Sequence, residues 1–140
     1  MRLMIDTNIL LDVLENRESF VAESLAIWEL CETGEVEGYI NALSVANIIY
    51  ILRKEILPEQ IPQIYTKLSL VFKIASLDPQ DISRSISNKW KDFEDGLQAE
   101  CAVRIHADHI ITRNIKDYIN SKVPALTPSV FLRDFCRKTK

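Results

Sequence analysis

Oxygen-bearing side chains follow two apolar segments of the chain. The apolar run 3–5 ends at Asp6, and the run 109–112 is followed by Asn114, with Asp117 three residues further on. Carboxylate and amide oxygens are the ligands that hard divalent cations prefer. These residues could therefore hold Mg²⁺ or Mn²⁺.

A further pair of acids opens a segment with helical spacing, residues 92–106. Asp92 and Asp95 are three residues apart, which places them on one side of a helix. Small alanines continue that stripe and would let it pack close to a sheet. We expect Asp95 at the rim between core and cleft, Asp92 to be more exposed, and Glu94 to point away from Asp95.

Each acid also has a purely structural interpretation. Asp and Asn are favoured at helix N-caps, and acids in a first turn are stabilised by the helix dipole. Carboxylates that share a cleft, however, raise one another's pKa unless a cation is present. A shared cation site explains their joint placement, and oxygen ligands favour Mg²⁺ or Mn²⁺ over zinc. His106 and His109 fall at the far end of the helix and the start of the next strand.

The elements that must position these residues alternate between strands and helices. This order predicts an α/β fold in three layers, helix, sheet and helix, with a mostly parallel central sheet. We expect one domain over residues 1–140. The predicted strands are 3–5, 39–42, 72–77, 109–112 and 124–126, and the predicted helices are 8–14, 21–33, 45–55, 59–70, 81–89, 92–106 and 129–136.

This fold converts sequence position into geometry. Ligand sites in parallel α/β sheets lie outside the carboxyl ends of the strands, where Asp6 and Asn114 fall. Crossover helices run antiparallel to the strands, so their N-termini return to the same edge. Asn47, expected to open the helix after Ala42, and the acids at 92–95 therefore converge on it.

Composition limits the classes of function. With 140 residues, 47% hydrophobic, and no segment of about 20 apolar residues, the chain predicts a globular, cytoplasmic protein without a membrane span. Its three scattered cysteines favour free thiols over a disulfide framework or a zinc site. A net charge of −3 means that any contact with nucleic acid must depend on a local basic patch.

Three segments in this order, LMIDTNILLD, FEDGLQAECA and IITRNIKDY, resemble a PIN domain, the nuclease fold of many VapC-type toxins. The resemblance implies Mg²⁺- or Mn²⁺-dependent hydrolysis of RNA phosphodiester bonds. It also implies a homodimer and a small antitoxin protein as partners. By motif, the catalytic residues are Asp6, Asp95, Asn114 and Asp117, the metal ligands are Asp6, Asp95, Asp92 and Asp117, and the supporting residues are Asn8, Asn47 and Thr112.

Two cations lie inside the third segment. Arg113 and Lys116 are the main candidates for binding substrate phosphates. A solvated surface charge is an equal alternative for Arg113 and the favoured one for Lys116 and for the weaker candidates, which are Arg53, Lys54, Lys89 and Lys91. The unbroken apolar run 48–52 predicts a helix that is either deeply buried or shared with another subunit, which favours the homodimer.

Two alternatives remain. Asn47 stands where many PIN nucleases have Glu, and an amide adds no charge and cannot act as a general base. The chain could therefore be a catalytically impaired PIN-like module that binds RNA or protein. A phosphoryl-receiving domain also places Asp at a strand end, but it usually has a second acid where this chain has Asn8.

Overall fold

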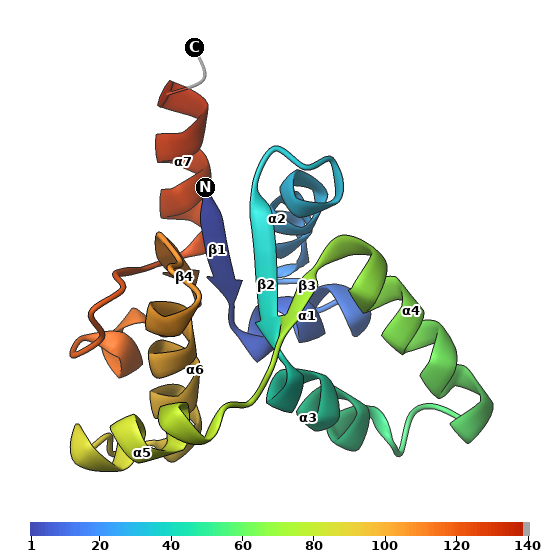
Figure 1. The fold of residues 1–140 in the computed structure, drawn as a ribbon. Helices are drawn as coiled ribbons and strands as arrows, with labels where there is room; N and C mark the ends of the chain where they lie inside the picture. Colours follow the sequence, from blue (N-terminus) through green and yellow to red (C-terminus); the bar gives the residue numbers. More distant parts are fainter. Residues whose placement is uncertain (139–140) are drawn as a thin grey trace.

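The computed structural model describes residues 1–138 as alternating strands and helices (Figure 1). The strands are β1 (Arg2–Ile5), β2 (Glu37–Asn41), β3 (Lys73–Ala75), β4 (His109–Ile111) and β5 (Ala125–Leu126). The helices are α1 (Thr7–Leu14), α2 (Val21–Glu32), α3 (Ala42–Leu52), α4 (Ile61–Val71), α5 (Pro79–Ser87), α6 (Phe93–Arg104) and α7 (Pro128–Lys138), with the 3₁₀ turns η1 (Pro58–Gln60) and η2 (Ile115–Tyr118).

The five strands form one parallel sheet in the order β3-β2-β1-β4-β5. The chain builds one half outward from β1 to β3 and then crosses to β4 on the other side of β1. The strand order therefore reverses between β1 and β4, and such a switch point opens a crevice at the carboxyl ends of the strands. The α/β fold with a parallel central sheet is confirmed.

Side chains of β1 alternate between the two faces of the sheet, as a strand requires. Leu3 and Ile5 join a buried cluster with residues of α1, α2, α3, α4 and α7, whereas Met4 joins a cluster with Ala99 and Ala102 of α6. Helices thus cover both faces, and the predicted three layers are confirmed. The small alanines of α6 do lie against the sheet.

Several element bounds differ from the prediction, because polar caps were not recognised. Helix α3 begins at Ala42 rather than Val45, since the Asn41 side chain accepts a hydrogen bond from the Leu43 amide at 2.7 Å. Asn47 therefore lies in the second turn of α3, and its expected place at the start of that helix was wrong. In α5 the side chain of Asp78 caps the helix, which therefore begins at Pro79, two residues before the predicted start.

No helix within residues 1–138 is long and apolar enough to cross a membrane. Of the three cysteines, Cys31 and Cys101 are buried and Cys136 is exposed.

Candidate active site

A cavity of about 480 Å³ opens at the carboxyl edge of the sheet, near the switch point, and α3 and α6 form two of its walls. In Figure 1 these two helices flank the arrowheads of the strands. The structure brings together here most of the residues singled out from the sequence: Asp6, Asn8, Asn47, Asp92, Asp95, Asn114 and Asp117.

Asp6 is the most buried acid of the cavity, at 9% exposure. Its backbone amide donates to the Ile111 carbonyl of β4, and its Oδ2 accepts a hydrogen bond from Thr112 Oγ1 at 2.8 Å. The same Thr112 oxygen accepts from the Asn114 amide at 3.1 Å. Thr112 thus ties the carboxylate after β1 to the loop after β4, across the switch point.

The protonation of Asp6 follows from this environment. Burial raises the pKa of Asp6 above its ordinary value, the hydrogen bonds from Thr112 and the Thr7 amide oppose that shift, and the negative charge of Asp117 adds to it. Burial thus disfavours the charged carboxylate, and a cation bound beside it would favour that form.

Asp95 lies at the N-terminus of α6, half-buried, and Asp92 is more exposed, as predicted. Asp92 caps the helix by accepting from the Asp95 amide at 3.0 Å, and Tyr118 donates to Asp95 Oδ1 at 3.3 Å. Burial and the negative charges of Asp92, Asp6 and Asp117 together raise the pKa of Asp95 to about 7. The carboxylates of the cavity therefore interact electrostatically with one another.

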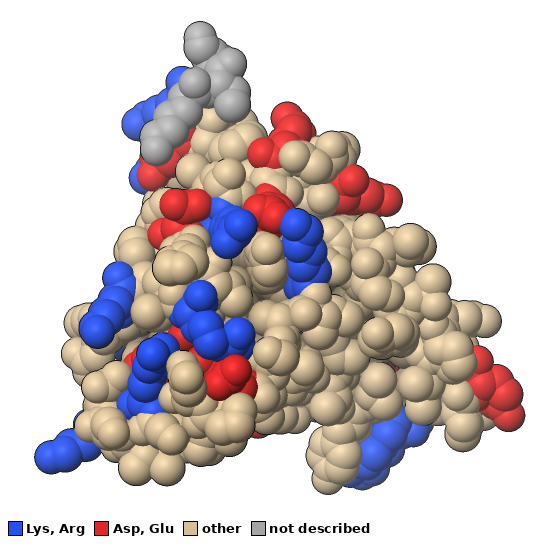
Figure 2. Space-filling view, in the orientation of Figure 1, with Lys and Arg blue, Asp and Glu red and all other residues tan. Residues whose placement is uncertain are grey.

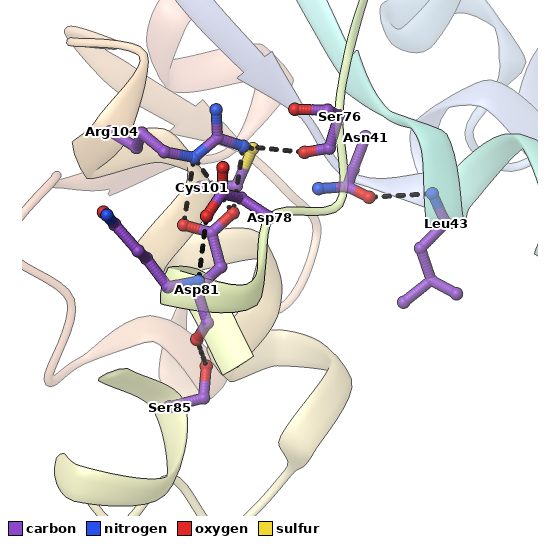
Figure 3. A network of polar contacts seen from close by, with 9 residues as sticks. Asn41, Leu43, Ser76, Asp78, Asp81, Ser85, Cys101 and Arg104 are labelled. Atoms are coloured by element: carbon purple, nitrogen blue, oxygen red, sulfur yellow. Dashed lines mark hydrogen bonds and ion pairs between the residues drawn. The ribbon is translucent and has the colours of Figure 1, made fainter. Parts of the chain in front are cut away.

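Two contacts hold α6 in position. Arg104, in its last turn, donates to both carboxylate oxygens of the fully buried Asp81 on α5 at 2.9–3.1 Å, and to the Ser76 carbonyl (Figure 3). Near the first turn, Gly96 lets the Trp90 ring lie directly on the helix, because a Cβ there would come within 2.7 Å of that ring. Both ends of α6 are fixed against neighbouring segments.

The α3 wall differs from the prediction. Asn47 Nδ2 donates to Glu94 Oε1 at 2.9 Å, and Glu94 lines the cavity. Glu94 was expected to point away from Asp95; its long side chain reaches across to α3 and lines the same cavity as Asp95. Glu94 thereby supplies a carboxylate on the wall where Asn47 has none.

The sequence interpretation missed a buried polar chain in the floor of the cavity. Thr7 Oγ1 lies 3.0 Å from Ser44 Oγ, and Gln98 Nε2 donates to the same oxygen at 2.7 Å. Gln98 Oε1 is buried without a hydrogen-bond partner among the described residues. Ser44 and Gln98 lie three residues from Asn47 and Asp95 on α3 and α6, so helical spacing from the named candidates could have found them.

The predicted phosphate-binding cations have different surroundings. Arg113 pairs with the fully buried Asp12 at 3.1 Å and stacks on Phe20, with its guanidinium carbon 3.9 Å from the ring centroid. It does not line the cavity. Lys116 is exposed and borders an adjoining cavity that shares Asp92, Asp95 and Asp117 with the first.

Comparison with known proteins places this geometry in a family. In solved structures, a similar fold occurs in the VapBC2 complex of Rickettsia felis, determined with a promoter DNA fragment (17% identity, TM-score 0.68, 91% of this chain and 98% of that one). It also occurs in a toxin–antitoxin complex from Klebsiella pneumoniae (22% identity, TM-score 0.68, 90% of this chain and 97% of that one). FitAcB of Neisseria gonorrhoeae has a similar fold as well (18% identity, TM-score 0.65, 91% of this chain and 98% of that one). Among proteins with curated descriptions, no sequence matches significantly. The PIN domain family model matches residues 2–116, and the chain belongs to this family.

Proposed function

We propose that the chain is a metal-dependent ribonuclease that hydrolyses RNA phosphodiester bonds, with Asp6 and Asp95 as the principal metal ligands. One observation carries the proposal: Asp6 and Asp95 line one cavity at the switch point of the sheet, and each has a raised pKa. Neighbouring acids whose pKa values are raised by burial and by one another's charge are typical of a functional site rather than of helix caps.

The residues present suit Mg²⁺ or Mn²⁺. Within residues 1–138, no three or more His, Cys, Asp or Glu side chains are grouped closely enough to hold an ion by themselves. Mg²⁺ does not need such a cage, because it is usually bound through one or two carboxylates together with water and substrate phosphates. All the donors that face the cavity are oxygens or amides, and the unpartnered Gln98 Oε1 adds a buried acceptor.

The chain's own residues would orient the reaction. Thr112 donates to one oxygen of Asp6, and Tyr118 donates to one oxygen of Asp95, so these hydrogen bonds would hold the two carboxylates in place beside an ion. Asn114 and Asp117, on the exposed η2 side, would extend the ligand set together with Asp92. A bound divalent ion supplies the remaining chemistry, by lowering the pKa of water and offsetting charge on the phosphate.

Cleavage of labelled single-stranded RNA tests this function. We expect cleavage with Mg²⁺ or Mn²⁺, none with EDTA, and loss of activity in Asp6→Asn and Asp95→Asn while circular dichroism shows a folded protein. Asp134→Asn is the matched control, because Asp134 lies on α7 outside the cavity. Cleavage that survives both cavity substitutions, or that continues in EDTA, would eliminate the proposed site.

A catalytically impaired RNA- or protein-binding module is the second candidate. The Asn47–Glu94 hydrogen bond favours it. The α3 wall of the cavity has Asn47 in place of an acid, and the Glu94 oxygen accepts a hydrogen bond from this amide. This candidate predicts RNA binding without cleavage, and no heat of binding when millimolar Mg²⁺ or Mn²⁺ is added in calorimetry.

We further propose that the protein is the toxin of a toxin–antitoxin pair and forms a homodimer. The run 48–52 is divided: Ile48 and Leu52 are buried, whereas Tyr50 and Ile51 are 63% and 44% exposed. This half-exposed helix face suits a protein partner. Light scattering of the purified chain, and co-expression with the neighbouring open reading frame, test the two partners separately. The cytoplasmic location stays a prediction.

A further inference from the structure

A second cavity, of about 310 Å³, adjoins the candidate active site. Asp92, Asp95 and Asp117 border both cavities, so a strand whose phosphate lies at these carboxylates has a direct path into the second one. The remaining walls come from the segment before α6 and from η2 with its following turn: Asn88, Lys89, Trp90, Lys91, Lys116, Ile119 and Asn120.

Three lysines distinguish this second cavity from the acidic one. Lys89, Lys91 and Lys116 are all exposed, and none has a carboxylate within ion-pair distance among residues 1–138. By contrast, Arg104 and Arg113 are each paired with a buried acid. Figure 2 shows Lys and Arg side chains, with Asp and Glu side chains between them, over the end of the molecule where α5 and α6 lie. The three ammonium groups are therefore available to an external anion.

The segment that carries two of these lysines is fixed in place. Asn88 Nδ2 and Trp90 Nε1 donate to the same Glu100 oxygen, at 2.6 and 3.3 Å. Between them, Lys89 has a φ of 54°. Residues other than Gly adopt this left-handed conformation only where the surrounding structure stabilises it. The backbone thus presents the lysines from a defined position, which reduces the entropy lost when they bind.

The cavity also has an apolar wall and an amide. Ile119 is 81% exposed, Trp90 is partly exposed, and Asn120 offers both a donor and an acceptor. An apolar surface beside an amide and several cations matches the parts of one nucleotide: the base, its hydrogen-bonding edge and its phosphates.

We propose that this lysine-lined cavity binds the nucleotide next to the scissile phosphodiester of single-stranded RNA. The proposal rests on the proposed ribonuclease function and adds a subsite to it. Lys89, Lys91 and Lys116 contact the phosphates that flank the reacting one, and Trp90 and Ile119 contact the base. Because an acidic chain must attract a polyanion locally, these lysines determine which side of the carboxylates the strand follows.

Binding of fluorescently labelled single-stranded RNA at several salt concentrations tests the subsite. All proteins carry Asp6→Asn, which lies in the first cavity only and keeps the RNA intact. The test protein adds Lys89→Gln and Lys91→Gln. Its matched control adds Lys54→Gln and Lys122→Gln, two exposed lysines outside both cavities, with the same change of charge.

Each phosphate contact to a single strand adds about 0.7 to the slope of log affinity against log salt. Loss of two contacts should lower the magnitude of the slope by about 1.4. If the test protein and the parent bind equally at 1 M salt, the test protein should bind about 25-fold more weakly than the parent at 0.1 M salt. The control should match the parent protein. RNA should also quench the fluorescence of Trp90, whereas a strand without bases should not. The other tryptophan, Trp28, is buried against Phe72, so a change in fluorescence reports on Trp90.

Equal slopes in the test and control proteins, or quenching by the strand without bases, would overturn the subsite. Such a result would leave the ribonuclease proposal intact, provided that the wild-type chain cleaves. Cleavage by the Asp6→Asn parent would instead contradict the active site itself, so the two failures are distinguishable.

Discussion

Replacing Asp95 with Asn should make the folded protein more stable at pH 8, although it removes a proposed metal ligand. Asn has the shape of a protonated Asp, and its Oδ1 can still accept the hydrogen bond from Tyr118. The substitution therefore removes the carboxylate charge and leaves its position unchanged. Functional sites often carry this kind of stored instability.

The magnitude follows from the pKa of Asp95, which burial and the charges of Asp92, Asp6 and Asp117 raise from 3.8 to about 7. A raised acid pKa means that the folded state prefers the protonated form, so stability falls as pH rises between about 4 and 7. The full shift of about 3 units corresponds to about 4 kcal/mol. Because Asp95 is only half-buried, solvent screening reduces this to about 2 kcal/mol at pH 8.

Urea unfolding in EDTA measures this effect. The gain in unfolding free energy of Asp95→Asn over wild type should be about 1 kcal/mol larger at pH 8 than at pH 5, where wild-type Asp95 is protonated when folded. Added Mg²⁺ should then stabilise the wild type and not the variant, because a ligand that binds only the folded state raises its stability.

If Asp95→Asn is no more stable than wild type at pH 8, or if the gain is the same at both pH values, the Asp95 carboxylate does not destabilise the folded protein as described. Asp134→Asn serves as the control, because it removes one negative charge from a partly exposed acid on α7, outside the cavity.

Three further predictions concern the supports of the site. Asp12→Ala should lower the free energy of unfolding by about 3 kcal/mol in urea titration, because it leaves the Arg113 guanidinium without its buried partner. Gly96→Ala should cost about 1–3 kcal/mol by the same measurement, and should change Trp90 fluorescence, since the new Cβ would overlap the Trp90 ring. Tyr118→Phe removes a hydrogen bond that lowers the pKa of Asp95, so the pH profile of cleavage should move to higher pH.

Each of these three predictions has an outcome that would contradict it. If Asp12→Ala unfolds at the wild-type urea concentration, the Asp12–Arg113 pair does not stabilise the fold. A Gly96→Ala protein with wild-type stability and fluorescence would show that Trp90 does not lie on α6 as described. An unchanged pH profile in Tyr118→Phe would show that Tyr118 does not influence the group that titrates.

The sequence predicted the edge on which the candidate site lies because a parallel sheet leaves little choice. Asp6 and Asn114 directly follow strands β1 and β4, and the acids at 92–95 begin a crossover helix, so the fold class alone brings them together. It could not predict Glu94. Whether that side chain reaches Asn47 depends on the distance between α3 and α6, which no local spacing encodes.

Arg113 shows a second limit of sequence patterns. It follows Thr112 directly, and both seemed to belong to the site because they adjoin it in the chain. Beyond the end of β4 the two side chains have different partners: Thr112 donates to Asp6, whereas Arg113 pairs with Asp12 of α1 and stacks on Phe20. Asp12 in turn needs a cation, because an ionised carboxylate with no exposure is costly to leave unpaired. The phosphate-binding role expected of Arg113 passes in our proposal to Lys116 and the lysines before α6, whose charges no acid of residues 1–138 neutralises by an ion pair.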